Sequence, residues 1–286
     1  MKHGLVLEGG ALRGLYSMGI VDVLMDEGIV FDGAVGVSAG AALGCNIKSG
    51  QVGRALRYNM RFAKDWRYCS VRSLFLTGDL YGAEYAYHKV PKEMDLFDIE
   101  AFNANGLPFW AVCTDVETGE AIYHLLDKAN DETYEWIRAS ASMPLCSRIV
   151  EAGGHKLLDG GVADSIPLAF MESKGFERNL VILTQPDGYV KQPNRFLPLM
   201  KMSSLRHYPQ FLQAVAQRHV MYNAELEFVR KREAEGRVLV FRPDTSLPIK
   251  HTSHDPKVMR RVYELGREQA LLRLNEVKAF LTDDGR

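Results

Sequence analysis

The chain has 286 residues, of which 47% are hydrophobic and 25% are charged, with 35 lysines and arginines against 36 aspartates and glutamates. This composition is typical of a globular protein with one large core, and it excludes intrinsic disorder, a collagen-like chain and a coiled-coil rod. The near-zero net charge argues against binding nucleic acid through a bulk positive field, which requires clustered lysine and arginine. We therefore expect no nucleic-acid partner.

Cysteine spacing and hydropathy further narrow the class of protein. The four cysteines are scattered singly, which predicts buried reduced thiols rather than a disulfide framework or a zinc site. The N-terminal segment reaches glycine and charge before an apolar signal run develops, and no stretch approaches the roughly 18 apolar residues of a spanning helix. We expect a cytoplasmic protein without metal or cofactor, in which any membrane contact is peripheral, at the inner face of the membrane.

The first 44 residues alternate strand and helix signals. Residues 5–7 form a short apolar run that stops at a glycine cluster, and residues 15–27 carry apolar side chains at helical spacing. A second apolar run at 34–37 leads into a small-residue helix at 39–44. Two strands joined by a helix form a βαβ unit, which favours an open sheet with helices on both faces.

Further elements are predicted along the rest of the chain. They are strands at 109–114 and 180–184, a hairpin return at 120–126, a helix at 133–142 and a tight turn after the apolar pair at 157–158. After about residue 190, prolines punctuate a segment rich in Phe, Leu and Met, followed by a helix at 211–232, a strand at 238–241 and a terminal helix at 257–281. We therefore divide the chain into a first domain at 1–190 and a mostly helical C-terminal extension at 191–286 that packs on the core or caps it.

A G-x-S-x-G pattern at residues 36–40 lies between an apolar strand and a small-residue helix. A serine on such a sharp strand-to-helix turn is pushed up to the helix N-terminus, and Gly36 and Gly40 let neighbouring backbone clear the strained turn. This context predicts that Ser38 is a nucleophile. The alternative is a Gly/Ser-rich loop that matches the pattern by chance.

Residues 8–14 form a second glycine turn, also at the end of a strand and the start of a helix. Consecutive backbone N–H groups there, reinforced by the helix dipole, would form an anion-binding nest suited to the oxyanion of acyl transfer. Nucleotide binding fits less well, because a dinucleotide fingerprint needs a glycine in place of Ala11 and a Walker loop needs a G-K-[ST] ending. A phosphate-binding loop is the alternative.

A serine nucleophile needs a base, and Asp159 is the candidate carboxylate. Its neighbours Gly160 and Gly161 are small enough to let a carboxylate approach the serine, whereas an ordinary Asp-Gly turn is the alternative. Histidines offer a conventional base instead, but none has a local context that singles it out. Those that follow Asp159 are His207, His219, His251 and His254.

Together these segments resemble the patatin-like phospholipases. That family has a glycine-rich oxyanion loop near the N-terminus, a G-x-S-x-G elbow, and a downstream Asp-Gly-Gly or Asp-Gly-Ala motif that supplies the aspartate of a Ser-Asp dyad. The resemblance covers residues 5–185. The segments similar to family motifs are 9–14, 36–40, 139–144 (the A-S-x-S-x-P segment) and 159–161, with Asp164 and Pro167 where bacterial members often have Asp and Pro.

The resemblance implies a patatin-like three-layer α/β fold, with a mainly parallel central sheet flanked by helices, and a lipid acyl hydrolase of phospholipase A or lysophospholipase type. Ser38 would attack an ester carbonyl and Asp159 would accept its proton. The N–H groups of Gly9, Gly10 and Ala11 would hold the oxyanion, and water would release the acyl-enzyme. The residues that support these motifs are Arg13, Gly14, Gly36, Gly40, Gly160 and Gly161.

The oxyanion loop departs from the family's usual Asp-Gly-Gly-Gly start. Glu8 and Ala11 stand where the family usually has aspartate and glycine. We expect this change to alter the curvature of the loop, while leaving its backbone donors and Arg13 available.

Two other classes of function remain open. One is a small-ester hydrolase with a Ser-His-Asp triad on an α/β-hydrolase fold, although that fold normally places several strands before its elbow and only one precedes Ser38 here. The other is a non-catalytic lipid or nucleotide binder that keeps the turns without turnover.

For a lipid substrate, residues 195–206 mix Phe, Leu and Met with cations and predict a surface that approaches a membrane. A cap packed onto the core by the same apolar residues is the alternative. The partner we expect is a lipid or ester substrate, and the sequence sets no oligomeric state.

Overall fold

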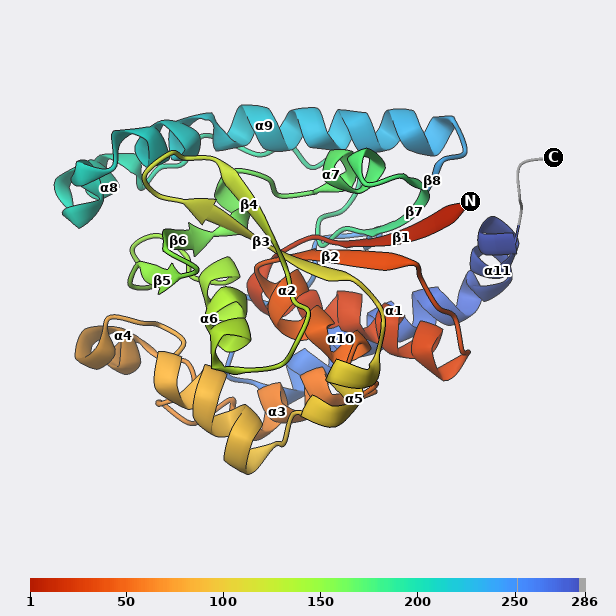
Figure 1. Ribbon diagram of the computed structural model, residues 1–286, viewed down its shortest axis with the longest axis horizontal. Coiled ribbons are helices and arrows are strands. Elements are labelled where there is room, and N and C mark those ends of the chain that lie inside the picture. Colours follow the sequence, from red (N-terminus) through yellow and green to blue (C-terminus); the bar gives the residue numbers. More distant parts are fainter. Residues whose placement is uncertain (251, 283–286) are drawn as a thin grey trace.

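The computed structural model describes residues 1–250 and 252–282. In addition to short 3-10 turns and a π-helix at Ala83–Met94, its elements in chain order are β1 (Lys2–Leu7), α1 (Gly14–Asp26), β2 (Gly33–Val37), α2 (Ala39–Gly44), α3 (Arg54–Phe62), α4 (Val71–Thr77), α5 (Ile99–Ala104), β3 (Phe109–Asp115), β4 (Ala121–Leu125), α6 (Asp131–Ser140), β5 (Val150–Ala152), β6 (His155–Asp159), α7 (Leu168–Ser173), β7 (Phe176–Ile182), α8 (Leu197–Met202), α9 (Pro209–Ala234), β8 (Val238–Phe241), α10 (Pro256–Leu272) and α11 (Leu274–Thr282) (Figure 1).

The strands form one sheet in the order β5-β6-β3-β2-β1-β7-β8, with β4 paired to β3. The strands β3, β2, β1, β7 and β8 run parallel, whereas β4, β5 and β6 join by antiparallel pairing. Helices α7 and α9 cover one face of this sheet, and α1, α2, α6 and α10 lie on the other (Figure 1). The predicted three-layer α/β fold with a mainly parallel sheet is therefore confirmed.

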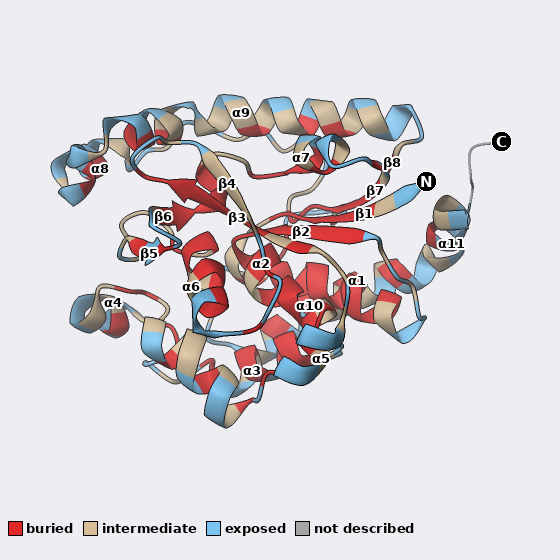
Figure 2. Ribbon diagram, viewed as in Figure 1, coloured by how far each residue is buried: buried red, intermediate tan, exposed pale blue. Residues whose placement is uncertain are grey.

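Side-chain alternation along the buried strands supplies a core on each face of the sheet. In β1, Leu5 and Leu7 pack in the cluster shared with α1 and α10, whereas Val6 packs in the cluster shared with α7 and α9. All three side chains are fully buried, as in most of the central strands (Figure 2). A parallel sheet buried on both faces reads as a continuous apolar run, which is why short runs such as 5–7 could be recognised as strands.

The end of the chain differs from its predicted form. The terminal helix predicted at 257–281 is two helices, because Arg273 interrupts α10 and α11 with a non-helical backbone. The guanidinium of Arg273 donates to the carbonyl oxygen of Val240 at 2.7 Å and to the carboxylate of Glu276. These contacts tie the break between the helices to β8. Helical periodicity in the sequence does not predict them.

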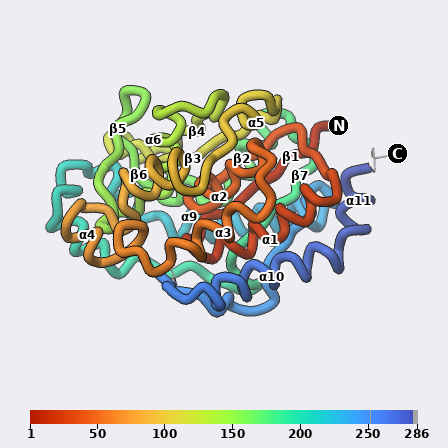
Figure 3. The backbone as a smooth tube through the Cα atoms, turned by 90° about the horizontal axis from the view of Figure 1, so that it is seen from below, coloured from red at the N-terminus to blue at the C-terminus, as the bar shows by residue number. Residues whose placement is uncertain are grey.

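The residues after position 190 take part in the same layers as those before it. Strand β8 pairs with β7 at the edge of the sheet, α9 crosses one face and α10 packs along α1 (Figures 1 and 3). The division of the chain at 190 stays a prediction. In the part of the chain that the structure describes, no helix combines the length and apolarity needed to cross a bilayer.

Candidate active site

Ser38 lies on a strained turn between β2 and α2. Its backbone has φ 55° and ψ −119°, a conformation that non-glycine residues rarely adopt. Gly36 and Gly40 make the turn possible by close approach. A Cβ on Gly36 would lie 2.3 Å from the carbonyl oxygen of Gly40, and a Cβ on Gly40 would lie 2.3 Å from that of Leu7. The spacing of the G-x-S-x-G pattern therefore has a steric cause in this fold.

Ser140, in the A-S-x-S-x-P segment, holds this turn against the sheet. Its Oγ accepts the N–H of Ser38 at 2.9 Å and donates to the carbonyl oxygen of Val112 at 2.6 Å. Ser140 is fully buried, so this hydroxyl satisfies a donor and an acceptor that would otherwise be unpaired. The motif thus fixes the strained serine to β3.

Ser38 and Asp159 meet although 121 positions separate them in the sequence. The hydroxyl of Ser38 donates to Oδ2 of Asp159 at 2.6 Å, and Oδ1 of Asp159 accepts the N–H of Gly161 at 2.8 Å. A Cβ on Gly160 would lie 2.0 Å from the carbonyl oxygen of Val112, so only glycine lets the turn after β6 approach β3 this closely. The Asp-Gly-Gly motif thereby places a carboxylate on the serine.

The environment of Asp159 favours its acting as a base. Its side chain is buried, and this burial raises the pKa of the carboxyl. The charge of Arg218, the Ser38 hydroxyl and the Gly161 N–H lower that pKa in part. A carboxylate with a raised pKa is a better acceptor for a hydroxyl proton than a solvated one.

The glycine loop that follows β1 lies beside Ser38, because β1 and β2 are parallel neighbours whose carboxyl ends share one edge of the sheet. A Cβ on Gly9 would lie 2.8 Å from Cβ of Ser38. Ala11 has φ 48°, a left-handed backbone at a position where the family usually has glycine. Within the described residues, the N–H groups of Gly9 and Gly10 donate to no protein acceptor, which leaves them available for an anion.

Glu8, which also departs from the family pattern, anchors this loop through buried hydrogen bonds. Its carboxylate is buried and accepts the backbone N–H of Thr184, at the end of β7, and the hydroxyl of Tyr222 on α9 at 2.6 Å. Arg13 lines the same pocket as Glu8, and Gly14 begins α1 where a Cβ would lie 3.0 Å from Cβ of Ala39. The glycine loop is thus held by Thr184, which follows β7, and by α9.

Two cations at the site come from the region after residue 190, where we predicted none. Nε of Arg218 donates to the carbonyl oxygen of Gly161, next to the candidate base. The ammonium of Lys191 lies 4.4 Å from the ring centroid of Tyr222. Burial and the nearby Arg218 lower the pKa of Lys191 to about 8.

A sequence signal for these residues does exist. On α9, Arg218, Tyr222 and Glu225 are spaced at i, i+4 and i+7, within a stripe whose other members, including Val215 and Val229, are buried and apolar. Polar groups that interrupt the buried face of an amphipathic helix need partners in the interior. Here those partners belong to the glycine loop and the turn that follows Asp159.

A buried carboxyl pair joins this turn to α9. The side chains of Asp164 and Glu225 are hydrogen-bonded to each other, which requires a shared proton. Asp164 also accepts the hydroxyl of Tyr123, and Glu225 accepts the N–H groups of Ser165 and Ile166. Burial raises the pKa of both carboxyl groups, and the charge of Asp164 raises that of Glu225 further.

We expect this pair to make the protein less stable as pH rises. The folded state keeps the shared proton while the unfolded state loses it above its ordinary pKa near 4, so the free energy of unfolding should fall by up to about 1.4 kcal/mol per pH unit. In Asp164→Asn the side-chain amide supplies the hydrogen, so that slope should flatten. Urea unfolding between pH 5.5 and 8.5 measures it, with exposed Asp187→Asn as the control that keeps the wild-type slope. Equal slopes for wild type and Asp164→Asn would contradict the shared proton.

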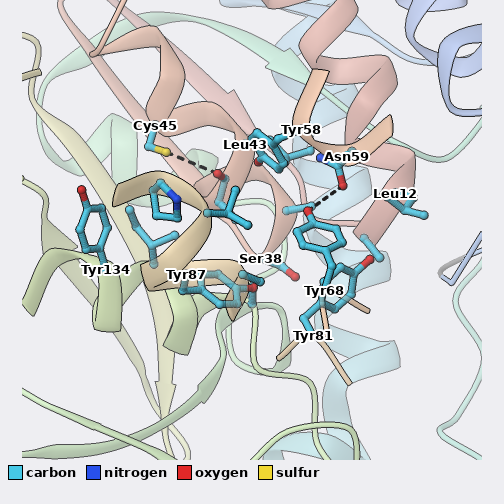
Figure 4. A pocket seen from close by; sticks show the side chains of 18 of the residues that line it. Leu12, Ser38, Leu43, Cys45, Tyr58, Asn59, Tyr68, Tyr81, Tyr87 and Tyr134 are labelled. Carbon is cyan, nitrogen blue, oxygen red and sulfur yellow. Dashed lines mark hydrogen bonds between the residues drawn. The ribbon is translucent and has the colours of Figure 1, made fainter. Parts of the chain in front are cut away.

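Two pockets of different character meet at Ser38. One, with a cavity volume of about 100 Å³, is mainly apolar, and its lining includes Leu12, Leu43, Tyr58, Tyr68, Tyr87, Val90, Phe97, Ile137 and Met143 (Figure 4). The other, with a cavity volume of about 360 Å³, is lined by the glycine loop, Asp159, Arg13, Lys191 and Arg218.

Charge within the apolar pocket is neutralised. Among the described residues that line it, Arg54 alone carries a charge, and this buried side chain pairs with buried Asp95 at 3.2 Å. The hydroxyl of Tyr68 donates to Oδ1 of Asn59 at 3.0 Å, so this polar pair is satisfied as well (Figure 4). The pocket therefore presents a surface suited to an uncharged hydrocarbon chain.

In the described part of the chain, no histidine is hydrogen-bonded to Ser38 or Asp159. His207, His219 and His254 contact Arg206 and the carbonyl oxygens of Ala216 and Ala63 respectively, and His251 lies outside the described residues. The same described residues hold no cluster of three His, Cys, Asp or Glu side chains able to bind a metal ion.

Comparison with known proteins agrees with this geometry. The sequence profile of the family described as patatin-like phospholipase matches residues 5–171. The chain belongs to this family. A second profile, for a domain of unknown function termed DUF6363, matches residues 208–282, the part of this family member that contains α9 and its contacts to the site.

Relatives of this patatin-like protein include both bacterial and fungal proteins. The chain is 26% identical to uncharacterized protein YjjU of Escherichia coli, over 99% of this chain and 80% of the relative. It is 32% identical to lysophospholipase NTE1 of Scheffersomyces stipitis, over 60% of this chain but only 11% of that protein. VipD from Legionella pneumophila is a structural neighbour with a TM-score of 0.46 and 12% identity, covering 96% of this chain and 67% of VipD. Membership of this phospholipase family supports lipid hydrolase activity.

Proposed function

We propose that the protein is a serine acyl hydrolase that cleaves the carboxylic ester of single-chain phospholipids through an acyl-enzyme. The observation that carries the proposal is the 2.6 Å hydrogen bond from Ser38 to buried Asp159 at the junction of an apolar and a cationic pocket. A nucleophile positioned against a base, beside unpaired backbone donors, is the arrangement that acyl transfer requires.

In the proposed reaction, Oγ of Ser38 bonds to the ester carbonyl carbon while its proton moves to Asp159. The N–H groups of Gly9, Gly10 and Ala11 hold the oxyanion of the tetrahedral intermediate. Collapse breaks the bond to the leaving alkoxide, which takes the proton from Asp159 and departs as an alcohol. Water then attacks the acyl-enzyme, giving up a proton to Asp159, and releases the fatty acid with restoration of the Ser38 hydroxyl.

The two pockets support a division of the substrate at Ser38. The acyl chain occupies the apolar pocket, and the glycerol and head group occupy the cationic one. The acidic groups in the cationic pocket are already engaged, Glu8 by Thr184 and Tyr222 and Asp159 by Ser38 and Gly161. Lys191 and Arg218 therefore favour a substrate that bears a phosphate.

Hydrolysis of lysophosphatidylglycerol and of a monoacylglycerol with the same acyl chain tests this assignment. The wild-type protein should release fatty acid from the lysophospholipid, and Ser38→Ala should reduce that release by about 10³-fold or more. Ser142→Ala is a matched control, since Ser142 is also buried but donates to a helix carbonyl oxygen rather than to Asp159. Turnover retained in Ser38→Ala would refute the proposal.

Lys191→Met should weaken use of the anionic substrate selectively. Lys191 is charged below its pKa of about 8, so kcat/KM for lysophosphatidylglycerol should fall as pH rises through 8. The charged groups that act on this ammonium are Arg218, Arg13, Glu8 and Asp159. In Lys191→Met the KM should rise about tenfold and the alkaline fall should disappear, with monoacylglycerol unaffected and Lys191→Arg restoring binding. Equal losses on both substrates would show that Lys191 does not contact the phosphate.

A further inference from the structure

Helix α4 exposes apolar side chains that no other part of the described chain covers. Val71 and Leu76 are each 62% exposed and Phe75 is 85% exposed. The spacing of Val71 and Phe75 by four residues puts them on one side of the helix. Arg72 lies between them, 4.3 Å from the ring centroid of Trp66.

Helix α8 exposes a second apolar stripe. Phe196, Leu199 and Met202, spaced by three residues each, are 49%, 54% and 78% exposed. Met200 of α8 and Leu205 in the 3-10 turn that follows are buried against the core. Residues 195–206 therefore combine the two alternatives considered from the sequence, since one side packs as a cap and the other stays uncovered.

The two helices flank the entrance to the cationic pocket. Both lie at the same end of the molecule, at the left of Figures 1 and 3. The pocket is lined near α4 by Leu80, whose N–H donates to the carbonyl oxygen of Cys146, and near α8 by Phe196 and Met200. Because Phe196 is half exposed and also lines the cationic pocket, it lies at the entrance of that pocket.

The charge around these stripes has one sign. Residues 188–224 contain five lysines and arginines and no aspartate or glutamate, although the whole chain is almost neutral. Arg195, Lys201 and Arg206 are exposed along this segment, and Arg72 and Arg148 are exposed on the side of α4. Apolar side chains ringed by cations match a surface whose interior is hydrocarbon and whose head groups are anionic.

We propose that α4 and α8 form a docking surface for an anionic phospholipid bilayer, made by Val71, Phe75, Leu76, Phe196, Leu199 and Met202. The bilayer would be contacted at the mouth of the cationic pocket, so that a lipid could enter without crossing water. The choice of a bilayer over a protein partner rests on the proposed function, because a protein seated there would close the mouth to a lipid substrate. Binding itself needs no turnover.

Co-sedimentation with vesicles tests the docking surface in the Ser38→Ala protein, which binds without consuming lipid. It should bind phosphatidylcholine vesicles that contain phosphatidylglycerol at least about tenfold more strongly than pure phosphatidylcholine vesicles. The double variants Phe75→Ser/Leu76→Ser and Leu199→Ser/Met202→Ser should each lower the partition coefficient about tenfold. Leu271→Ser/Leu272→Ser on α10, which removes equally exposed apolar side chains elsewhere, should bind like its parent.

Several outcomes would overturn the docking surface. They are binding to neither vesicle, unchanged binding in the α4 and α8 variants, and self-association through the same residues in place of vesicle binding. In protein that keeps Ser38, the α4 and α8 variants should hydrolyse a short water-soluble ester at the wild-type rate. A lower rate would show that the substitutions disturb the fold rather than the docking surface. Failure of hydrolysis altogether would refute the proposed function while leaving the vesicle result intact.

Discussion

Asp159→Asn should reduce kcat for lysophospholipid hydrolysis by about 10³-fold, with secondary structure and stability close to wild type. The amide cannot accept a proton at physiological pH, and its Nδ2 would donate toward Oγ of Ser38 in place of the present 2.6 Å acceptor. General-base catalysis by a positioned side chain contributes roughly 10²–10⁴-fold, and loss of the nucleophile's orientation adds to it. Steady-state release of fatty acid at a saturating substrate concentration measures the effect.

The histidine variants make this prediction specific. His207→Ala, His219→Ala and His254→Ala should each keep kcat within about threefold of wild type, because these side chains bond elsewhere. The same measurement on His251→Ala covers the remaining histidine that follows Asp159. If one histidine variant lost as much activity as Asp159→Asn, the result would favour a Ser-His-Asp triad over the Ser-Asp dyad.

Gly9→Ala should lower kcat by about 10²–10³-fold through the oxyanion loop. The new Cβ would lie 2.8 Å from Cβ of Ser38 and 2.9 Å from the carbonyl oxygen of Val37, which is backbone and cannot swing away. The loop would have to shift, and its N–H groups would leave the position of the developing oxyanion. KM should change little, since Gly9 itself does not line the acyl pocket.

Gly106→Ala is the matched control for this substitution. A Cβ on Gly106 would meet no heavy atom within 4 Å, so its kcat should equal that of wild type. Thermal unfolding of both variants separates catalysis from folding, because the predicted loss of kcat in Gly9→Ala should far exceed its loss of stability. Wild-type kcat in Gly9→Ala would show that the glycine loop does not stabilise the transition state.

The central strands and the motif turns could be predicted from the sequence because their cause is local. Short apolar runs that stop at a glycine cluster and at Ser38 predicted β1 and β2. Gly36 is required by a local contact with Gly40, whereas Gly40 is required by the carbonyl oxygen of Leu7 on the neighbouring strand. The hairpin return at 120–126 was also predicted, and it forms as β4 against β3. Local sterics and strand burial therefore determine this part of the fold.

The rest of the site depends on contacts between distant segments. No helix or strand was predicted for residues 45–104, yet their tyrosines line the apolar pocket. Tyr58 reaches it from α3, Tyr68 from the turn after α3 and Tyr87 from the π-helix. Lys191 and Arg218 act near Asp159 only through the way α9 crosses the sheet. The hydrophobic periodicity of the chain does not predict how α9 crosses the sheet. The polar residues on the buried side of α9 do indicate that they have hydrogen-bonding partners in the interior.

The departures of the glycine loop from its family pattern also acquire physical reasons. Glu8 reaches Thr184 and Tyr222 together, and so ties the loop to β7 and to α9. Ala11 accepts a left-handed backbone at a cost of order 1 kcal/mol, which the surrounding contacts must offset. The loop keeps the donors expected of it while the region after residue 190 holds it in place.

The most direct test of the account is mass spectrometry of the intact and digested protein after reaction with a fluorophosphonate. We expect one covalent phosphonyl adduct, located on Ser38, with labelling greatly slowed in Asp159→Asn and absent in Ser38→Ala. An unlabelled wild-type protein, or an adduct on another residue while Ser38→Ala still releases fatty acid, would contradict it.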